Sequence, residues 1–170
     1  MPRRHPVPRL WLMTDERQGE TLWRALERLP ERSGVVFRHY SLTAAERHRL
    51  FEDVRSICRR GNLTLLAGGL PLPGADGVHG RRGAGLKSAS AHNLRELQAA
   101  ERGGADLVFL SPVFATRSHP GVRPLGPRRF ALLAHQAKVP VIALGGMNEE
   151  RFRHLGGAHG WAGIDAWSAD

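Results

Sequence analysis

Hydroxyl, imidazole and glycine residues of the kinds that bind anions follow two apolar runs of the chain. The first group lies in the loop of residues 111–126, SPVFATRSHPGVRPLG, and consists of Thr116, Ser118 and His119. The second is the pair Gly145-Gly146, which precedes a helix-like stretch. Long loops between short elements usually bind a ligand, and glycine N–H groups at a helix start can approach an anion closely. These segments predict a site for a phosphorylated small molecule, although a tight turn alone also calls for glycine.

The composition agrees with a small anionic partner. The chain has 170 residues, 41% of them hydrophobic, and a formal net charge of +9. Its arginines are spread through the sequence, and aromatics that could stack on bases are few, so we do not expect a nucleic-acid partner. No apolar run has the roughly 20 residues that a membrane span requires, and no signal peptide is recognised. The single cysteine, Cys58, lies in a helical pattern and predicts a buried structural thiol in a reducing, cytoplasmic compartment.

Short apolar runs alternate with helical patterns along the whole chain. Eight runs are strand candidates, at residues 10–13, 35–37, 63–66, 77–79, 86–90, 107–110, 139–144 and 160–164. Helical patterns cover about 20–32, 43–60, 92–102, 127–136 and 148–154. In the second of these, Thr43 with Glu46 three residues on predicts a capping box. Most strand candidates are continuous apolar runs, as expected of parallel strands that are buried on both faces.

This alternation predicts a single domain over residues 1–170 with a compact (β/α)8 barrel fold. Such barrels typically need about 250 residues. The third and fourth crossovers, within residues 67–85, are too short for full helices, and no full helix follows the last run. We therefore expect a minimal or incomplete barrel, with an open doubly wound sheet as the alternative.

In a parallel barrel the functional side chains gather at the carboxyl ends of the strands. Read in order, these ends are Thr14-Asp15, Arg38-His39-Tyr40, Ala67-Gly68-Gly69, His79-Gly80, Ser90, the loop 111–126, Gly145-Gly146 and Asp165. They predict a polar, glycine-rich rim around one end of the barrel.

Several of these segments resemble the thiamine-phosphate synthase/TenI family. The loop 111–126 is similar to the family pattern GPVFxTxTKxGxxPLG, and PVIALGGMN (140–148) is similar to PVxAIGGI. LWLMTDE (10–16), ADGVHG (75–80), Ser90-Ala91-His92 and AERGGADLVFLSPVF (100–114) follow the family's order, so the resemblance covers most of the chain.

The resemblance implies a barrel and a defined chemistry. Synthases of the family join an aminopyrimidine diphosphate to a thiazole phosphate and release pyrophosphate, with Mg²⁺ assisting. By position, Arg38 and Ser90 would contact the diphosphate as catalytic residues. Thr116, Ser118 and His119 would contact the substrate, and Gly145-Gly146 would bind the thiazole phosphate.

The chain departs from the family pattern mainly where the metal and the diphosphate bind. The altered positions are Val36, Tyr40, Ala67-Gly68, Gly80-Arg81-Arg82-Gly83, His119 and Asp165. The changes at 67–68 and 80–83 remove the expected metal carboxylates, so we predict no Mg²⁺ site and no other cofactor. One hypothesis is that Arg81 and Arg82 replace the metal, because guanidinium groups bind diphosphate bidentately.

Three further readings stay open. In the TenI branch, which isomerises a thiazole phosphate carboxylate, a histidine base stands where this chain has Pro112. His79 or His119 could replace that base, or both could be structural. The protein could also bind a phosphorylated ligand without turnover, in a regulatory role. The oligomeric state, a homo-oligomer included, is not fixed by the sequence.

Overall fold

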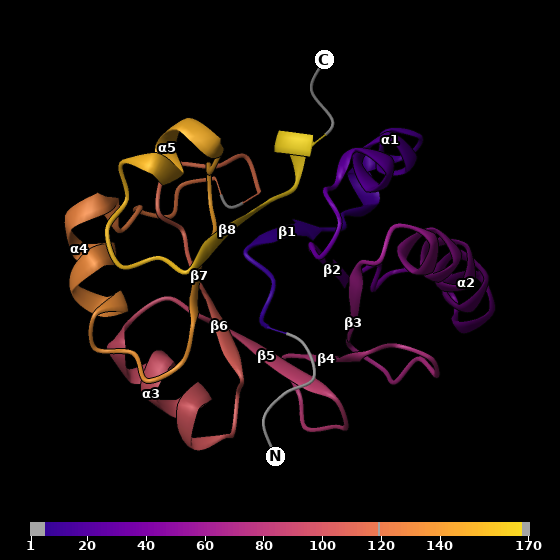
Figure 1. Cartoon of the computed structure of the whole chain (residues 1–170), viewed down its shortest axis with the longest axis horizontal. Helices are drawn as coiled ribbons and strands as arrows, with labels where there is room; N and C mark the ends of the chain where they lie inside the picture. Colours follow the sequence, from indigo (N-terminus) through magenta and orange to yellow (C-terminus); the bar gives the residue numbers. More distant parts are fainter. Residues whose placement is uncertain (1–5, 119, 168–170) are drawn as a thin grey trace.

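The computed structural model describes residues 6–118 and 120–167, which form a closed barrel of eight parallel strands (Figure 1). The strands are β1 (Leu10–Met13), β2 (Gly34–Phe37), β3 (Thr64–Gly68), β4 (Gly77–His79), β5 (Leu86–Ala91), β6 (Leu107–Leu110), β7 (Val141–Ala143) and β8 (Gly160–Gly163). Each strand pairs with the next, and β8 pairs with β1, with Trp11 opposite Ala162. The predicted barrel is therefore confirmed, and the alternative of an open sheet is wrong.

Alternate residues of the strands fill the interior of the barrel. This inner cluster consists of Trp11, Met13, Val36, Leu66, Leu107, Phe109, Ile142 and Ala162. The Trp11 ring packs edge-on against Phe109, with 5.3 Å between centroids, and lies over Gly34 of the neighbouring strand. A Cβ atom at Gly34 would come within 2.2 Å of the Trp11 ring. Gly34 thus leaves the space that a large interior side chain needs in a small barrel.

Five α-helices of the described residues cover the outside. They are α1 (Thr21–Arg28), α2 (Ala44–Arg60), α3 (Leu94–Arg102), α4 (Gly126–Ala134) and α5 (Glu149–Arg153). The short 3₁₀ turns η1 (Glu16–Gln18) and η2 (Asp165–Trp167) follow β1 and β8. In Figure 1, α1 and α2 lie on one side of the barrel, and α3, α4 and α5 lie on the other. Each group has its own apolar cluster between helices and strands.

Helix α2 forms as its sequence predicts. Thr43 Oγ1 accepts from the Glu46 N–H, and the Glu46 carboxylate accepts from the Thr43 N–H at 3.0 Å, which confirms the capping box. Its inward face carries Phe51, Val54 and Cys58, all fully or almost fully buried. The buried thiol of Cys58 is confirmed, and burial raises its pKa to about 12, so it stays protonated.

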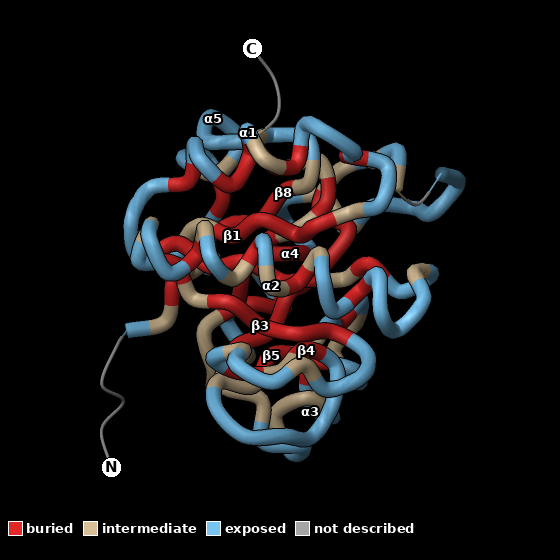
Figure 2. The backbone as a smooth tube through the Cα atoms, turned by 90° about the vertical axis from the view of Figure 1, so that its right-hand side faces the viewer, coloured by how far each residue is buried: buried red, intermediate tan, exposed pale blue. Residues whose placement is uncertain are grey.

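The third and fourth crossovers contain no helix in the part of the chain that the structure describes, as predicted. Asp76 replaces a packing helix as the anchor of the third crossover. Its carboxylate accepts from the Leu65 N–H at 2.8 Å, and its own N–H donates to the Leu65 carbonyl at 2.8 Å. Figure 2 shows buried strands surrounded by exposed loops and helix faces. No helix among residues 6–118 and 120–167 has the length and apolarity to cross a membrane.

Candidate functional site

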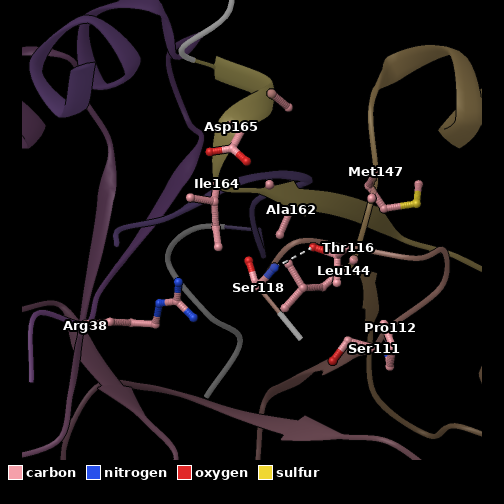
Figure 3. A pocket seen from close by; sticks show the side chains of 14 residues that line it. Arg38, Ser111, Pro112, Thr116, Ser118, Leu144, Met147, Ala162, Ile164 and Asp165 are labelled. Carbon is pink, nitrogen blue, oxygen red and sulfur yellow. Dashed lines mark hydrogen bonds between the residues drawn. The ribbon is translucent and has the colours of Figure 1, made fainter. Parts of the chain in front are cut away.

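A pocket opens at the carboxyl ends of β6, β7 and β8, and Arg38 reaches it from β2 (Figure 3). The residues that line this pocket are Arg38, Ser111, Pro112, Thr116, Ser118, Leu144, Gly145, Gly146, Met147, Ala162, Gly163, Ile164, Asp165 and Ala166. They include five residues that the sequence predicts as site residues: Arg38, Thr116, Ser118, Gly145 and Gly146. The fold therefore brings together side chains that are up to about a hundred residues apart in the chain.

The loop 111–126 is held against the end of β7 by its own backbone. The Val113 N–H donates to the Leu144 carbonyl at 2.9 Å, and the Phe114 N–H donates to the Gly145 carbonyl at 3.0 Å. At the other end of the loop, the Gly126 N–H donates to the Val113 carbonyl at 2.9 Å. The start and the end of the loop are thus fixed to each other and to β7, while its middle carries Thr116 and Ser118 over the pocket.

Gly145 and Gly146 are required by this close packing. Their φ angles are 98° and 61°, in the region that favours glycine. A Cβ at Gly145 would lie 2.7 Å from Pro112 Cα, and a Cβ at Gly146 would lie 2.8 Å from the Ala115 carbonyl oxygen. Among the hydrogen bonds of the described residues, none is donated by the N–H of Gly145, Gly146 or Met147. Consecutive N–H groups without a partner at such a turn are a binding place for an anion.

Arg38 is the cation that lines the pocket. Its Nε donates to the Thr14 carbonyl at 2.7 Å, and its Nη2 lies 3.2 Å from an Asp15 carboxylate oxygen. These contacts fix the guanidinium at the end of β2, with 21% of the side chain exposed. Burial lowers the pKa of Arg38, and the Asp15 charge opposes that change. An arginine keeps its charge under such conditions, so a partly buried cation faces the pocket.

Asp15 joins Arg38 to a second arginine. Arg17 makes a bidentate contact with the Asp15 carboxylate, at 2.7 and 3.0 Å. The hydrogen bond from Arg17 is the main reason why the pKa of Asp15 falls to about 2. Arg17 Nη2 also donates to Ser118 Oγ at 3.1 Å, which connects the segment after β1 to the loop after β6. The sequence reasoning missed Arg17 as a residue of this site, although it lies only two positions beyond the strand end at Thr14-Asp15; it also missed the apolar lining residues Leu144, Met147 and Ala162.

Ser90 lies apart from the pocket. It does not line the pocket, and its Oγ is 3.4 Å from His79 Nε2 on the neighbouring strand. His79 Nδ1 is 2.9 Å from Ser88 Oγ, and its ring packs edge-on against Phe109. Burial lowers the pKa of His79 to about 4, with a smaller effect from Arg38. An imidazole with so low a pKa is a weak proton acceptor, and His79 is fixed by two serines and does not line the pocket, which does not favour its role as a base for a ligand there.

The other half of the rim, around the end of β3, is packed differently. The Tyr40 side chain covers Gly68 and Gly69, and a Cβ at Gly68 would lie 2.5 Å from the Tyr40 hydroxyl. The buried guanidinium of Arg47 donates to the Gly68 carbonyl at 2.5 Å and to the His39 carbonyl at 3.0 Å. Arg81 donates to the Gly69 carbonyl at 2.6 Å. An aromatic ring and two arginines thus surround the end of β3.

Comparisons with known proteins agree with this geometry. A family model described as "Thiamine monophosphate synthase" matches residues 85–167, which include the loop and the two glycines. A protein of Aquifex aeolicus named "Putative thiamine-phosphate synthase 2" is 32% identical over 180 aligned residues, which cover 93% of this chain and 96% of that protein. The chain belongs to the thiamine-phosphate synthase family.

Two further proteins are similar to this chain. The thiamine-phosphate synthase of Chloroflexus aurantiacus is 29% identical over 93% of this chain and 84% of its own length. Among solved structures, the thiamine phosphate pyrophosphorylase of Pyrococcus furiosus superposes with a TM-score of 0.78, at 23% identity, over 95% of this chain and 88% of that one. This second likeness shows that the fold is shared.

The carboxylates of the described residues do not fit the Mg²⁺ site that the family implies. Asp15 is engaged by two arginines, and Asp76 accepts from a backbone N–H of β3. Positions 67 and 68 are alanine and glycine, and Gly68 lies beneath Tyr40. Within residues 6–118 and 120–167, no group of three or more histidine, cysteine, aspartate or glutamate side chains could hold a metal ion. We therefore derive no chemical step through Mg²⁺.

The remaining residues that the sequence analysis singled out are His119, Asp165, Arg81 and Arg82. His119 lies outside the described residues. Asp165 lines the pocket, as its position at the end of the last strand predicts. Arg81 is exposed and donates to the Gly69 carbonyl at the end of β3, whereas the exposed Arg82 makes no side-chain hydrogen bond or ion pair within the described part of the chain.

Proposed function

We propose that this protein acts in thiamine biosynthesis by binding a thiazole phosphate in the pocket at the ends of β6, β7 and β8. One observation carries the proposal: Arg38, two loop hydroxyls and a pair of glycines from three distant segments converge on one pocket. Its ligand is thus a phosphorylated small molecule. The cytoplasm, as the compartment of this chemistry, belongs to the same proposal.

The pocket has a polar and an apolar part, which match the two parts of such a ligand. The free N–H groups of Gly145, Gly146 and Met147, with the hydroxyls of Thr116 and Ser118, would hold the phosphate. The thiazole ring would lie against the apolar side chains that line the same pocket, which are Leu144, Met147, Ala162 and Ile164. Concave sites with apolar walls and a few directed polar groups are typical of small-molecule binding.

We propose the family's coupling reaction as the activity to test. In that reaction the bond between the pyrimidine methylene carbon and the diphosphate oxygen breaks, pyrophosphate leaves with the electron pair, and a C–N bond to the thiazole forms. A cation beside the departing diphosphate stabilises the developing charge. Arg38 is placed for this, because it lines the pocket from the β2 side while the phosphate-binding groups lie on the β6 and β7 side.

A second candidate function is binding of the thiazole phosphate without turnover. It is favoured by the end of β3, where the sequence Ala67-Gly68-Gly69 provides no carboxylate and Tyr40 packs over the two glycines. Such a protein would bind or deliver the ligand, and it would not release pyrophosphate.

Two measurements separate these functions. Isothermal titration with thiazole phosphate is expected to give saturable binding, which Gly146→Val abolishes and the exposed loop substitution Arg123→Ala leaves unchanged. Pyrophosphate release from both substrates, with Mg²⁺ or with EDTA, is then measured beside Arg38→Ala. Release that is insensitive to EDTA and lost in Arg38→Ala supports coupling without a metal. Binding without release assigns the second function, and no binding by the wild type would refute the proposal.

A further inference from the structure

Arg17 occupies a position at the edge of the pocket that three separate segments define. It lies in η1, directly after β1, where Asp15 caps the turn and Gln18 completes a capping box. Its guanidinium grips Asp15 through two nitrogens and reaches Ser118, 101 residues further along the chain. Ser118 lines the pocket, whereas Arg17 itself stands just outside the lining. Arg17 therefore acts on the pocket through Ser118 and through its charge.

Arg17 affects the balance of charge around the pocket. The lining contains one cation, Arg38, and one carboxylate, Asp165. Asp15 adds a second negative charge beside Arg38. Arg17 is in direct contact with Asp15, and the negative charge of Asp165 also contributes to raising the pKa of Arg17. With Arg17 the four groups sum to zero, and without it they leave one negative charge at a place proposed for a phosphate.

The other arginines near the rim are not placed to balance this negative charge as Arg17 does. Arg151 donates to the Gly146 carbonyl and stacks over Phe114, with 4.6 Å from its Cζ to the ring centroid, and it does not line the pocket. Arg47 and Arg81 are bonded to carbonyls at the end of β3. Of these arginines, Arg17 alone contacts both a pocket-lining hydroxyl and a carboxylate of the rim.

We infer that Arg17 is a positioning residue that makes the pocket selective for the phosphorylated form of its ligand. It balances Asp15 and Asp165, and it holds the Ser118 hydroxyl over the pocket. A phosphate carries one to two negative charges at neutral pH, so it is repelled by an unbalanced carboxylate, whereas a neutral thiazole alcohol is not. The inference rests on the proposed function, and it adds a determinant that neither the loop nor the glycine pair provides.

The test compares the phosphorylated thiazole with the unphosphorylated thiazole alcohol by calorimetric titration. Arg17→Gln is expected to weaken binding of the phosphate by about tenfold or more and to change binding of the alcohol by less than about twofold. Arg17→Lys keeps the charge but loses the fork, so its effect should be intermediate. Asp165→Ser should tighten phosphate binding, and Arg17→Gln combined with Asp165→Ser should recover most of the lost affinity.

Other outcomes decide against the inference. Equal weakening of both ligands by Arg17→Gln would show a merely structural role, as would a double variant that is no better than Arg17→Gln. Thermal unfolding of each variant shows whether it is folded. The same series with inorganic pyrophosphate separates the two proposals. If the wild type binds pyrophosphate but not thiazole phosphate, a loss in Arg17→Gln supports this inference while the proposed function fails. If the wild type binds neither anion, both are overturned.

Discussion

The two halves of the barrel's rim use their polar groups in opposite ways. At the ends of β6, β7 and β8, the backbone N–H groups of Gly145, Gly146 and Met147 have no hydrogen-bond partner among the described residues, and the hydroxyls of Thr116 and Ser118 line the same pocket. Around the end of β3, the guanidinium groups of Arg47 and Arg81 are bonded to backbone carbonyls, and Tyr40 covers two glycines. Buried polar groups that are satisfied internally stabilise a fold, whereas unsatisfied ones are available to a ligand. The first half is therefore built for binding and the second for structure.

The largest expected effect comes from closing the binding half. Gly145→Ala places a Cβ at a φ of 98° and 2.7 Å from Pro112 Cα, and the backbone atoms of Pro112 and Val113 that it meets cannot shift easily. We expect a loss of about 3 kcal/mol in the free energy of unfolding and no measurable binding of thiazole phosphate. Urea unfolding and titration measure the two effects.

Gly121→Ala is the matched control for this substitution. Gly121 lies in the loop 111–126 and also has a positive φ, of 81°, but nothing lies within 4 Å of an added Cβ. Only the backbone cost of about 1 kcal/mol should remain, with binding retained. Equal losses in both variants would mean that the close packing at Gly145 is not what shapes the pocket.

The next largest effect is the pH dependence of stability that the buried His79 causes. The pKa of His79 falls from 6.5 to about 4 on folding, because burial disfavours its charged form. The unfolded chain therefore binds a proton that the folded protein does not, and stability is complete above pH 6.5 and decreases as the pH falls toward 4. The decrease amounts to about 3 kcal/mol over that range. His79→Gln should flatten this part of the pH profile of the free energy of unfolding, and an unchanged slope would contradict the assignment.

A smaller effect is expected when a carboxylate is returned to β3. In Gly68→Asp the new Cβ meets the Tyr40 hydroxyl, so we expect about 1 to 2 kcal/mol of destabilisation. Tyr40→Lys should relieve this in the double variant, since the aromatic ring is removed. Thermal unfolding with and without Mg²⁺ measures both points. If Gly68→Asp alone is as stable as the wild type, Tyr40 does not block this half of the rim.

The smallest effect on stability is expected for Arg81→Ala, because Arg81 is exposed and makes only carbonyl contacts. We expect a change below about 0.5 kcal/mol in the free energy of unfolding. Its value lies in the pyrophosphate assay, where reduced release, with Arg82→Ala unchanged, would support the hypothesis that Arg81 replaces a metal. Release equal to that of the wild type would end that hypothesis.

Much of this organisation could be predicted locally. All eight strands lie where short apolar runs predict them, and α2 begins at the capping box of Thr43 and Glu46. The boundaries differ by a few residues: the apolar run 139–144 yields a strand only over Val141–Ala143, which begins after Pro140 and ends before the turn at the glycine pair. The loop 111–126 and the glycine pair, identified as a candidate site, do line one pocket.

The sequence by itself determined what depends on neighbours along the chain: strand runs, caps, turns and the chemical character of each strand end. The tertiary structure decided what depends on distance across the barrel. Closure between β1 and β8, the fit of Trp11 over Gly34, the cover of Tyr40 on Gly68 and the contact between Arg17 and Ser118 each join residues from different strands or loops. The physical reason is that such contacts arise from strand register and packing, which bring together side chains that no local pattern connects.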